Sequence, residues 1–194
     1  RWLATRGLPP LHFLVEPNTL VELRDRKFYV ATLNGRVMGL LTLCPIPTRQ
    51  GWLTEQFVRD PDAPNGTIEF LLHHAASDLA SQEHYRGGLF TMGMVPLSAQ
   101  TEARGFGAPP PGWFELLKRW SRAHGRRFYN FGGLEAFKNK FQPDTWEPIW
   151  AITNRPKLTY PALRSVAQAF TVEVPEFAIA KGLVRAIRIE SQRI

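Results

Sequence analysis

An Asn34-Gly35 pair between two apolar runs is the feature that most constrains the fold of this chain. The runs that flank it are residues 28–33 (FYVATL) and 36–44 (RVMGLLTLC). Asn and Gly tolerate the positive φ angles that a two-residue hairpin turn requires, and the flanking runs are rich in β-formers. The sequence therefore predicts an antiparallel β-hairpin over residues 28–44.

The rest of the chain alternates between runs typical of strands and amphipathic runs typical of helices. We expect strands at residues 52–58, 88–94, 128–131 and 147–152, and helices at 67–83, 113–124, 134–141 and 161–170. Residues 95–112, rich in Pro, Gly and Ala, are expected to form a long loop. This order predicts a mixed α/β or α+β domain with a central, mostly antiparallel sheet flanked by helices.

The charge and the length of the chain limit its possible functions but do not identify one. The 194 residues suit one domain, and the net charge of +7 favours polyanionic partners such as tRNA, anionic lipid headgroups or nucleotide phosphates. A basic surface that binds no particular partner would give the same net charge. No apolar run is long enough to cross a bilayer, and the first ten residues lack the apolar core of a signal peptide. The chain begins with Arg1, as expected for a piece of a longer protein.

Several kinds of catalytic site are disfavoured by the motifs present. The adjacent His73 and His74 diverge by about 100° on a helix, and there is no HExxH or CxxC, so we expect no metal. The single cysteine, Cys44, lies in an apolar run and is expected to be a buried structural thiol. There is no GxSxG, and the faintly phosphate-loop-like RGFGA at 104–108 runs into three prolines, which disfavours a CoA site.

The expected helix at 134–141 carries the most informative charges. Glu135 and Lys138 are spaced i, i+3 and can pair, with Lys140 close by. A Gly132-Gly133 turn before the helix would let a ligand approach the backbone. The alternative is a solvated ion pair on a surface helix.

Two other groups of polar residues are candidates. A group of carboxylates between residues 55 and 69 could hold the ammonium of an amino acid, or could simply cap a helix start. Its members are Glu55, Asp60, Asp62 and Glu69. Ser98 follows a predicted strand, which is a reasonable place for a site residue. Its alternative role is to cap a loop with its hydroxyl.

Three blocks of sequence carry a resemblance to a known family: PDAPNGTIEFLL (61–72), LFTMGMVPLS (89–98) and FYNFGGLEAFKNKFQPDTWEPIW (128–150). In this order they resemble the C-terminal domain of the aminoacyl-phosphatidylglycerol synthases, which include lysyl-phosphatidylglycerol synthase, also called the multiple peptide resistance factor. The blocks cover about a quarter of the chain. The resemblance implies a GNAT-like acyltransferase fold over residues 1–160, with residues 161–194 as a helical, basic C-terminal extension.

The resemblance also implies an activity. Family members move an aminoacyl group, lysyl or alanyl, from aminoacyl-tRNA to the glycerol hydroxyl of phosphatidylglycerol at the cytosolic face of the membrane. Such a reaction needs no metal or redox cofactor. The implied partners are aminoacyl-tRNA, the anionic lipid, and a membrane domain or first GNAT-like half outside this chain. Two alternatives stay open: a GNAT-like transferase with a peptide, protein or other lipid as acceptor, and a non-catalytic module that binds anionic lipid or RNA.

The donor in that reaction is already an activated ester. Catalysis then needs positioning, a proton acceptor for the lipid hydroxyl and stabilisation of an oxyanion. The resemblance assigns catalytic roles to Ser98 and Asn130, which would orient the reacting carbonyl, and to Lys138, which would face phosphate. The residues expected to bind substrate are Glu55, Arg59, Asp60, Glu69, Met94, Glu135 and Lys140.

Overall fold

The computed structural model describes residues 23–85, 87–100, 111–124, 131–150, 152, 157–171 and 176–177. Described residues up to Gly93 belong to one compact unit, the sheet unit, and those from Met94 onward belong to a second, the helical unit. No helix in these ranges is long and apolar enough to cross a membrane.

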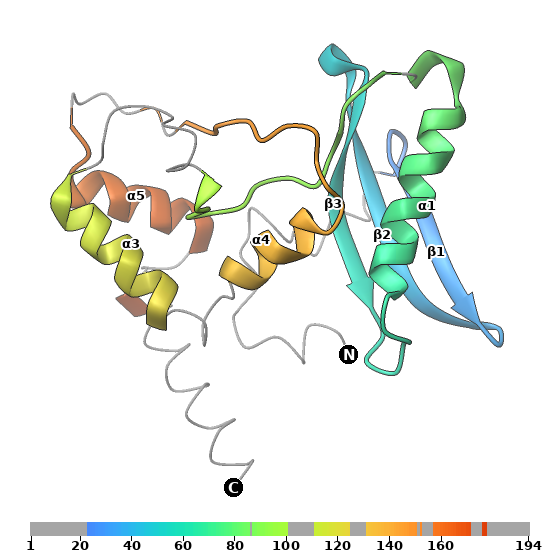
Figure 1. Ribbon diagram of the computed structural model, residues 1–194, viewed down its shortest axis with the longest axis horizontal. Coiled ribbons are helices and arrows are strands. Elements are labelled where there is room, and N and C mark those ends of the chain that lie inside the picture. Colours follow the sequence, from blue (N-terminus) through green and yellow to red (C-terminus); the bar gives the residue numbers. More distant parts are fainter. Residues whose placement is uncertain are drawn as a thin grey trace, which may run out of the picture. The chain divides into compact units, whose positions relative to one another are not determined.

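The sheet unit contains a four-stranded mixed sheet in the order β1-β2-β3-β4 (Figure 1). Its strands are β1 (Lys27–Leu33), β2 (Arg36–Ile46), β3 (Gly51–Arg59) and β4 (Phe90–Thr91). The first three pair antiparallel, and β4 pairs parallel with β3. The 3-10 turn η2 (Pro47–Arg49) joins β2 to β3, while helix α1 (Thr67–Ser81) and the 3-10 turn η3 (Glu83–Tyr85) lie between β3 and β4.

The predicted hairpin is confirmed. Leu33 pairs with Arg36, and the two turn residues between them have positive φ angles, 50° at Asn34 and 74° at Gly35. The predicted strand at 52–58 is confirmed as β3, and the helix expected at 67–83 is α1. The strand expected at 88–94 is shorter, because only β4 forms ladder pairs. The predicted α+β fold with a mostly antiparallel sheet is confirmed.

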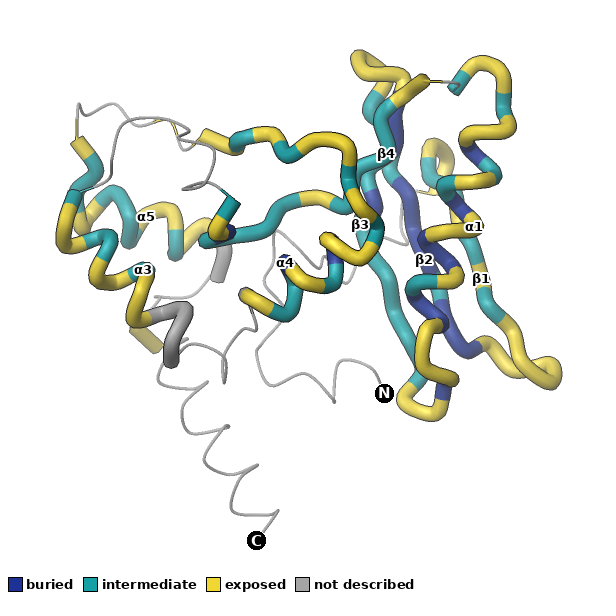
Figure 2. Tube along the Cα trace, in the orientation of Figure 1, coloured by how far each residue is buried: buried dark blue, intermediate teal, exposed yellow. Residues whose placement is uncertain are grey.

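Helix α1 contacts β1, β2 and β3, and it lies along one face of the sheet (Figure 1). The core between them is apolar: Leu41 and Leu43 are fully buried, and Leu71 and Leu72 of α1 are almost so. Figure 2 shows this buried layer along β2 and α1. The Tyr29 hydroxyl of β1 donates to the Asp78 carboxylate of α1 at 2.6 Å, which ties the helix to the sheet's first strand.

Two glycines permit the parallel pairing of β3 with β4. The Trp52 amide of β3 donates to the Leu89 carbonyl at 2.7 Å. A Cβ atom built on Gly51 would lie 2.5 Å from that same carbonyl oxygen, and one built on Gly88 would overlap the backbone oxygen of Gln50. The two main chains are therefore too close for a side chain at either glycine.

The helical unit contains α3 (Gly112–His124), α4 (Phe131–Asn139) and α5 (Tyr160–Thr171). The helices expected at 113–124 and 161–170 are confirmed. Helix α4 begins three residues before the expected 134, so Gly132 and Gly133 lie in its first turn rather than in a preceding turn. First-turn amides have no intrahelical acceptor, and glycine adopts helical φ angles readily, so the pair does not block the helix.

Two strands expected in the helical unit differ from the structure. Phe131, placed in a strand by the sequence, is helical, while residues 128–130 lie outside the described ranges. The strand predicted at 147–152 is wrong for residues 147–150, which form no ladder, and Ile149 and Trp150 are exposed. Apolar β-formers favour a strand only where a neighbouring strand pairs with them.

Candidate functional site

The helical unit contains a group of polar contacts between residues 94–99 and helix α4. We call it the anchor cluster, and it consists of Met94, Ser98, Ala99, Glu135 and Lys138. The Lys138 ammonium donates to the Met94 carbonyl at 3.0 Å, and the Ala99 amide donates to the Glu135 carboxylate at 3.1 Å. Two side chains one helical turn apart thus hold two backbone groups of the same segment.

The charged members of the anchor cluster are buried. Glu135 is 8% exposed, Lys138 is 5% exposed and Ser98 is 7% exposed. Within the described part of the helical unit, these three are the buried residues. A solvated ion pair on a surface helix, which was the sequence-based alternative, is therefore wrong. Buried charged groups need hydrogen-bonding partners, and the segment 94–99 provides them.

Burial lowers the pKa of Lys138 from 10.5 to about 8, because the charged ammonium is poorly solvated there. A lysine with such a pKa releases its proton much more readily than an exposed lysine does. Groups that exchange a proton near neutral pH are typical of functional sites, although buried structural pairs show the same behaviour.

Ser98 forms the contact expected of a loop-capping hydroxyl. Its Oγ accepts a hydrogen bond from the Gln100 amide at 3.1 Å. The preceding residue, Leu97, has a φ angle of 54°, in the left-handed region that leucine rarely adopts. No residue pattern predicts this conformation at Leu97, because glycine and asparagine are its usual occupants. The strained segment is held in place by Glu135 and Lys138.

Glu55, in the sheet unit, is already paired. Arg26 donates to its carboxylate from Nε at 2.6 Å and from Nη2 at 3.1 Å. Both side chains are about one-fifth exposed. Its predicted role in holding a substrate ammonium stays a prediction, and a ligand would have to share the carboxylate with Arg26. Nearby Cys44 is half-buried, and burial raises the pKa of its thiol, which disfavours the nucleophilic thiolate.

The other predicted residues of the sheet unit lie around the start of α1. Arg59 donates to the Asn65 side chain at 3.3 Å, and the Asp60 carboxylate accepts from the Asp62 amide at 2.9 Å. Glu69 is in the first turn of α1, where a negative charge interacts favourably with the helix dipole. Glu69 therefore fits the alternative of a helix start favoured by negative charge, but the N-cap residue of α1, Gly66, has no side-chain capping hydrogen bond.

Two predicted residues of the 128–141 block remain. Lys140 follows α4, is exposed, and has its ammonium 5.8 Å from the centre of the Phe137 ring. Asn130 lies outside the described residues. Of the predicted site residues, the structure therefore brings together Met94, Ser98, Glu135 and Lys138.

A small cavity of about 170 Å³ in the sheet unit was not predicted from the sequence. Its lining includes Trp52 and Tyr85, and the Lys27 ammonium lies 5.1 Å from the centre of each ring. The buried Trp52 Nε1 has no hydrogen-bond partner. Among the described residues, no three His, Cys, Asp or Glu side chains are grouped so as to hold a metal ion.

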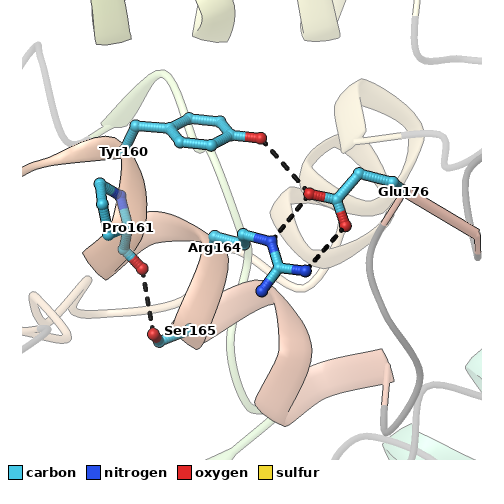
Figure 3. Close-up of polar contacts among 5 residues, drawn as sticks. All are labelled: Tyr160, Pro161, Arg164, Ser165 and Glu176. Carbon is cyan, nitrogen blue, oxygen red and sulfur yellow. Dashed lines mark hydrogen bonds and ion pairs between the residues drawn. The ribbon is translucent and has the colours of Figure 1, made fainter.

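An exposed ion pair joins α5 to Glu176. Arg164 donates to Glu176 from Nε at 2.8 Å and from Nη2 at 3.3 Å, and the Tyr160 hydroxyl donates to the same carboxylate at 3.4 Å (Figure 3). The hydrogen bond to Glu176 raises the pKa of Arg164, and the same bond lowers the pKa of Glu176. Solvent screens such a pair strongly, so its geometry indicates local order and little stability.

Comparisons with known proteins point to one family. The family described as "Phosphatidylglycerol lysyltransferase, C-terminal" matches residues 1–153. A crystal structure described as the "C-terminal Domain (DUF2156) of Putative Lysylphosphatidylglycerol Synthetase from Agrobacterium fabrum" is 26% identical, with a TM-score of 0.46. That similarity covers 74% of this chain and 39% of the other, so the chain spans about two-fifths of its length. Comparison with curated proteins gives no significant match.

Proposed function

The chain belongs to the phosphatidylglycerol lysyltransferase C-terminal family, and on that premise we propose that it is an aminoacyltransferase acting on phosphatidylglycerol. In this proposal the donor is an aminoacyl-tRNA carrying lysine or alanine, and the reaction takes place at the inner surface of the cell membrane. The family match over residues 1–153 carries the proposal, because that range includes both the sheet and the anchor cluster.

The proposed reaction exchanges one ester for another. The lipid hydroxyl oxygen bonds to the ester carbonyl carbon while its proton passes to a base. The tetrahedral intermediate then collapses, and the tRNA ribose oxygen leaves and takes up a proton. Both the donor and the acceptor lipid are anionic, which suits a chain with a net charge of +7.

We assign the anchor cluster a positioning role in this reaction. Lys138 and Glu135 are buried and direct their hydrogen bonds to the backbone of residues 94–99. A buried ammonium bound to a carbonyl is poorly placed to meet phosphate from solvent. In our proposal both residues therefore fix the segment that presents Ser98 to the reacting carbonyl, and small displacements of such a segment are costly for catalysis.

The direct test is a transfer assay with radiolabelled lysyl-tRNA or alanyl-tRNA and vesicles that contain phosphatidylglycerol. Label in the lipid fraction supports the proposal. Label in a peptide, a protein or another lipid would indicate a transferase with a different acceptor. Binding of tRNA or vesicles with no transfer to any acceptor would contradict an enzymatic role.

Paired variants of Glu135 test the positioning role. Glu135→Gln keeps an oxygen that can accept from the Ala99 amide, whereas Glu135→Ala leaves that amide without its partner. We expect the alanine variant to lose at least about tenfold in kcat and the glutamine variant to retain most activity. Circular dichroism spectra check that both variants are folded. Equal losses would mean that the negative charge, rather than the hydrogen bond, is required.

A further inference from the structure

Helix α3 presents its apolar side to solvent. Its apolar stripe, spaced i, i+3, i+4 and i+7, consists of Trp113, Leu116, Leu117 and Trp120. These side chains are 39%, 67%, 39% and 58% exposed, in that order. Such a stripe normally faces the protein core. The half-buried residues of α3, where its side chains are described, are Phe114, Glu115 and Lys118, and the last two are joined by an ion pair of 2.9 Å.

Other large apolar side chains of the helical unit are exposed as well. They include Ile149, Trp150, Tyr160 and Phe177, with exposed fractions between 60% and 70%. The burial colours of Figure 2 show α3 as exposed and half-buried where its side chains are described. Contiguous exposed apolar side chains, such as the four of the α3 stripe, mark an interaction surface.

We propose that the α3 stripe docks on an anionic lipid bilayer, with the helix lying in the plane of the membrane surface. Tryptophan suits this position, because its ring is apolar while its N–H can bond to headgroups or water. A helix of 13 residues is about 20 Å long, so it can lie along the surface but is too short to cross.

The charges near the stripe favour an anionic surface over a second copy of the chain. Exposed Arg119 is about 60° around the helix from Leu116, next to the stripe. The nearest acidic residue of α3, Glu115, is neutralised by Lys118. Two copies of the chain, each with a net charge of +7, would repel one another, whereas anionic headgroups complement that charge.

The inference rests on the proposed function, since the acceptor lipid lies in such a bilayer, but docking can be measured without any transfer. The test is sedimentation of the protein with vesicles of phosphatidylcholine, with and without phosphatidylglycerol. The variant combines Leu116→Gln with Trp120→Gln. Its matched control is Phe70→Gln, which changes a side chain on α1 of the sheet unit that is 64% exposed.

We expect the unmodified protein to bind the phosphatidylglycerol vesicles, and the double variant to partition at least about tenfold less, because two large apolar groups no longer enter the interface. The Phe70→Gln control should partition like the unmodified protein. Unchanged partition of the double variant, or an equal loss in the control, would overturn the inference. A concentration-dependent dimer that only the double variant abolishes would also overturn it, because the stripe would then join two copies.

Transfer to short-chain phosphatidylglycerol, dissolved as monomers, separates failure of docking from failure of the proposed function. The double variant should transfer to monomers at the same rate as the unmodified protein, and to vesicles at a lower rate. If the unmodified protein transfers to neither form, the proposed function fails, while vesicle sedimentation still decides the docking inference. An equal loss on monomers and vesicles would overturn docking, because the stripe would then act in the reaction itself.

Discussion

The two units of this molecule differ in the side chains that they bury: among the described residues, the sheet unit buries apolar side chains and three threonines, and the helical unit buries polar and charged ones. Among the described residues, every buried apolar side chain lies in the sheet unit, whereas the buried residues of the helical unit are Ser98, Glu135 and Lys138. Apolar burial contributes directly to stability, while buried charges contribute position and little net stability. The sheet unit therefore has the features of a structural scaffold, and the helical unit has the features expected of a functional site.

The largest effect should come from removing apolar volume in the sheet unit. Leu41→Ala is expected to lower the free energy of unfolding by about 2–5 kcal/mol, because Leu41 is fully buried beneath α1 and a cavity would remain. Urea denaturation followed by circular dichroism measures this change. Phe70→Ala, on the exposed side of α1, is the control, and an equal loss there would contradict the assignment of the core.

The buried lysine of the helical unit should make stability depend on pH. With a pKa of about 8 when folded and 10.5 when exposed, Lys138 binds fewer protons in the folded than in the unfolded state between those values. Stability should therefore rise with pH over this window, by on the order of 2 kcal/mol relative to Lys138→Met. Denaturation of both proteins at pH 7.5 and 10.5 measures the difference. A constant difference would mean that Lys138 is solvated.

The ion pair of the sheet unit gives a smaller expected effect. Arg26 and Glu55 are both about one-fifth exposed, so Glu55→Gln should cost about 1 kcal/mol of unfolding free energy. A double-mutant cycle with Arg26→Ala isolates the coupling between the two side chains. A large rise in the KM for aminoacyl-tRNA without any loss of stability would contradict the scaffold role and favour substrate binding by Glu55.

The smallest effect is expected at the exposed pair near α5. Arg164→Ala should leave the unfolding midpoint unchanged, at low and at high salt, because the side chains of Arg164 and Glu176 are 38% and 50% exposed and solvent screens their charges. Differential scanning calorimetry at two salt concentrations measures this. A clear drop in the midpoint would mean that stability in the helical unit depends on its surface charges, and the contrast between the units would then weaken.

Local signals predicted the sheet unit better than the helical unit. The Asn34-Gly35 turn and the periodicity of α1 act within a few residues, so both could be found from the sequence. The burial of Lys138 depends on a backbone carbonyl 44 residues away, and no local pattern encodes such a contact. For the same reason residues 147–150 were predicted as a strand, since their sequence does not show whether a partner strand exists.

The candidate site was predicted mainly through resemblance to a family. The blocks around Ser98 and Glu135 pointed to the segment and the helix that the structure joins, but not to how they are joined. Leu97, with its left-handed backbone, could not be predicted, because its residue type argues against that conformation. The GNAT-like fold, the tRNA donor and the division at residue 160 stay predictions.

The glycine pair at the start of β3 and before β4 has an evolutionary consequence. The obstacle to a side chain at Gly51 or Gly88 is main chain, so no compensating mutation elsewhere can make room for one. In relatives that keep this parallel pair, both positions should remain glycine together. One glycine before and one after an amphipathic helix could then identify this parallel connection from β3 to β4 in sequences too divergent for their other motifs to be recognised.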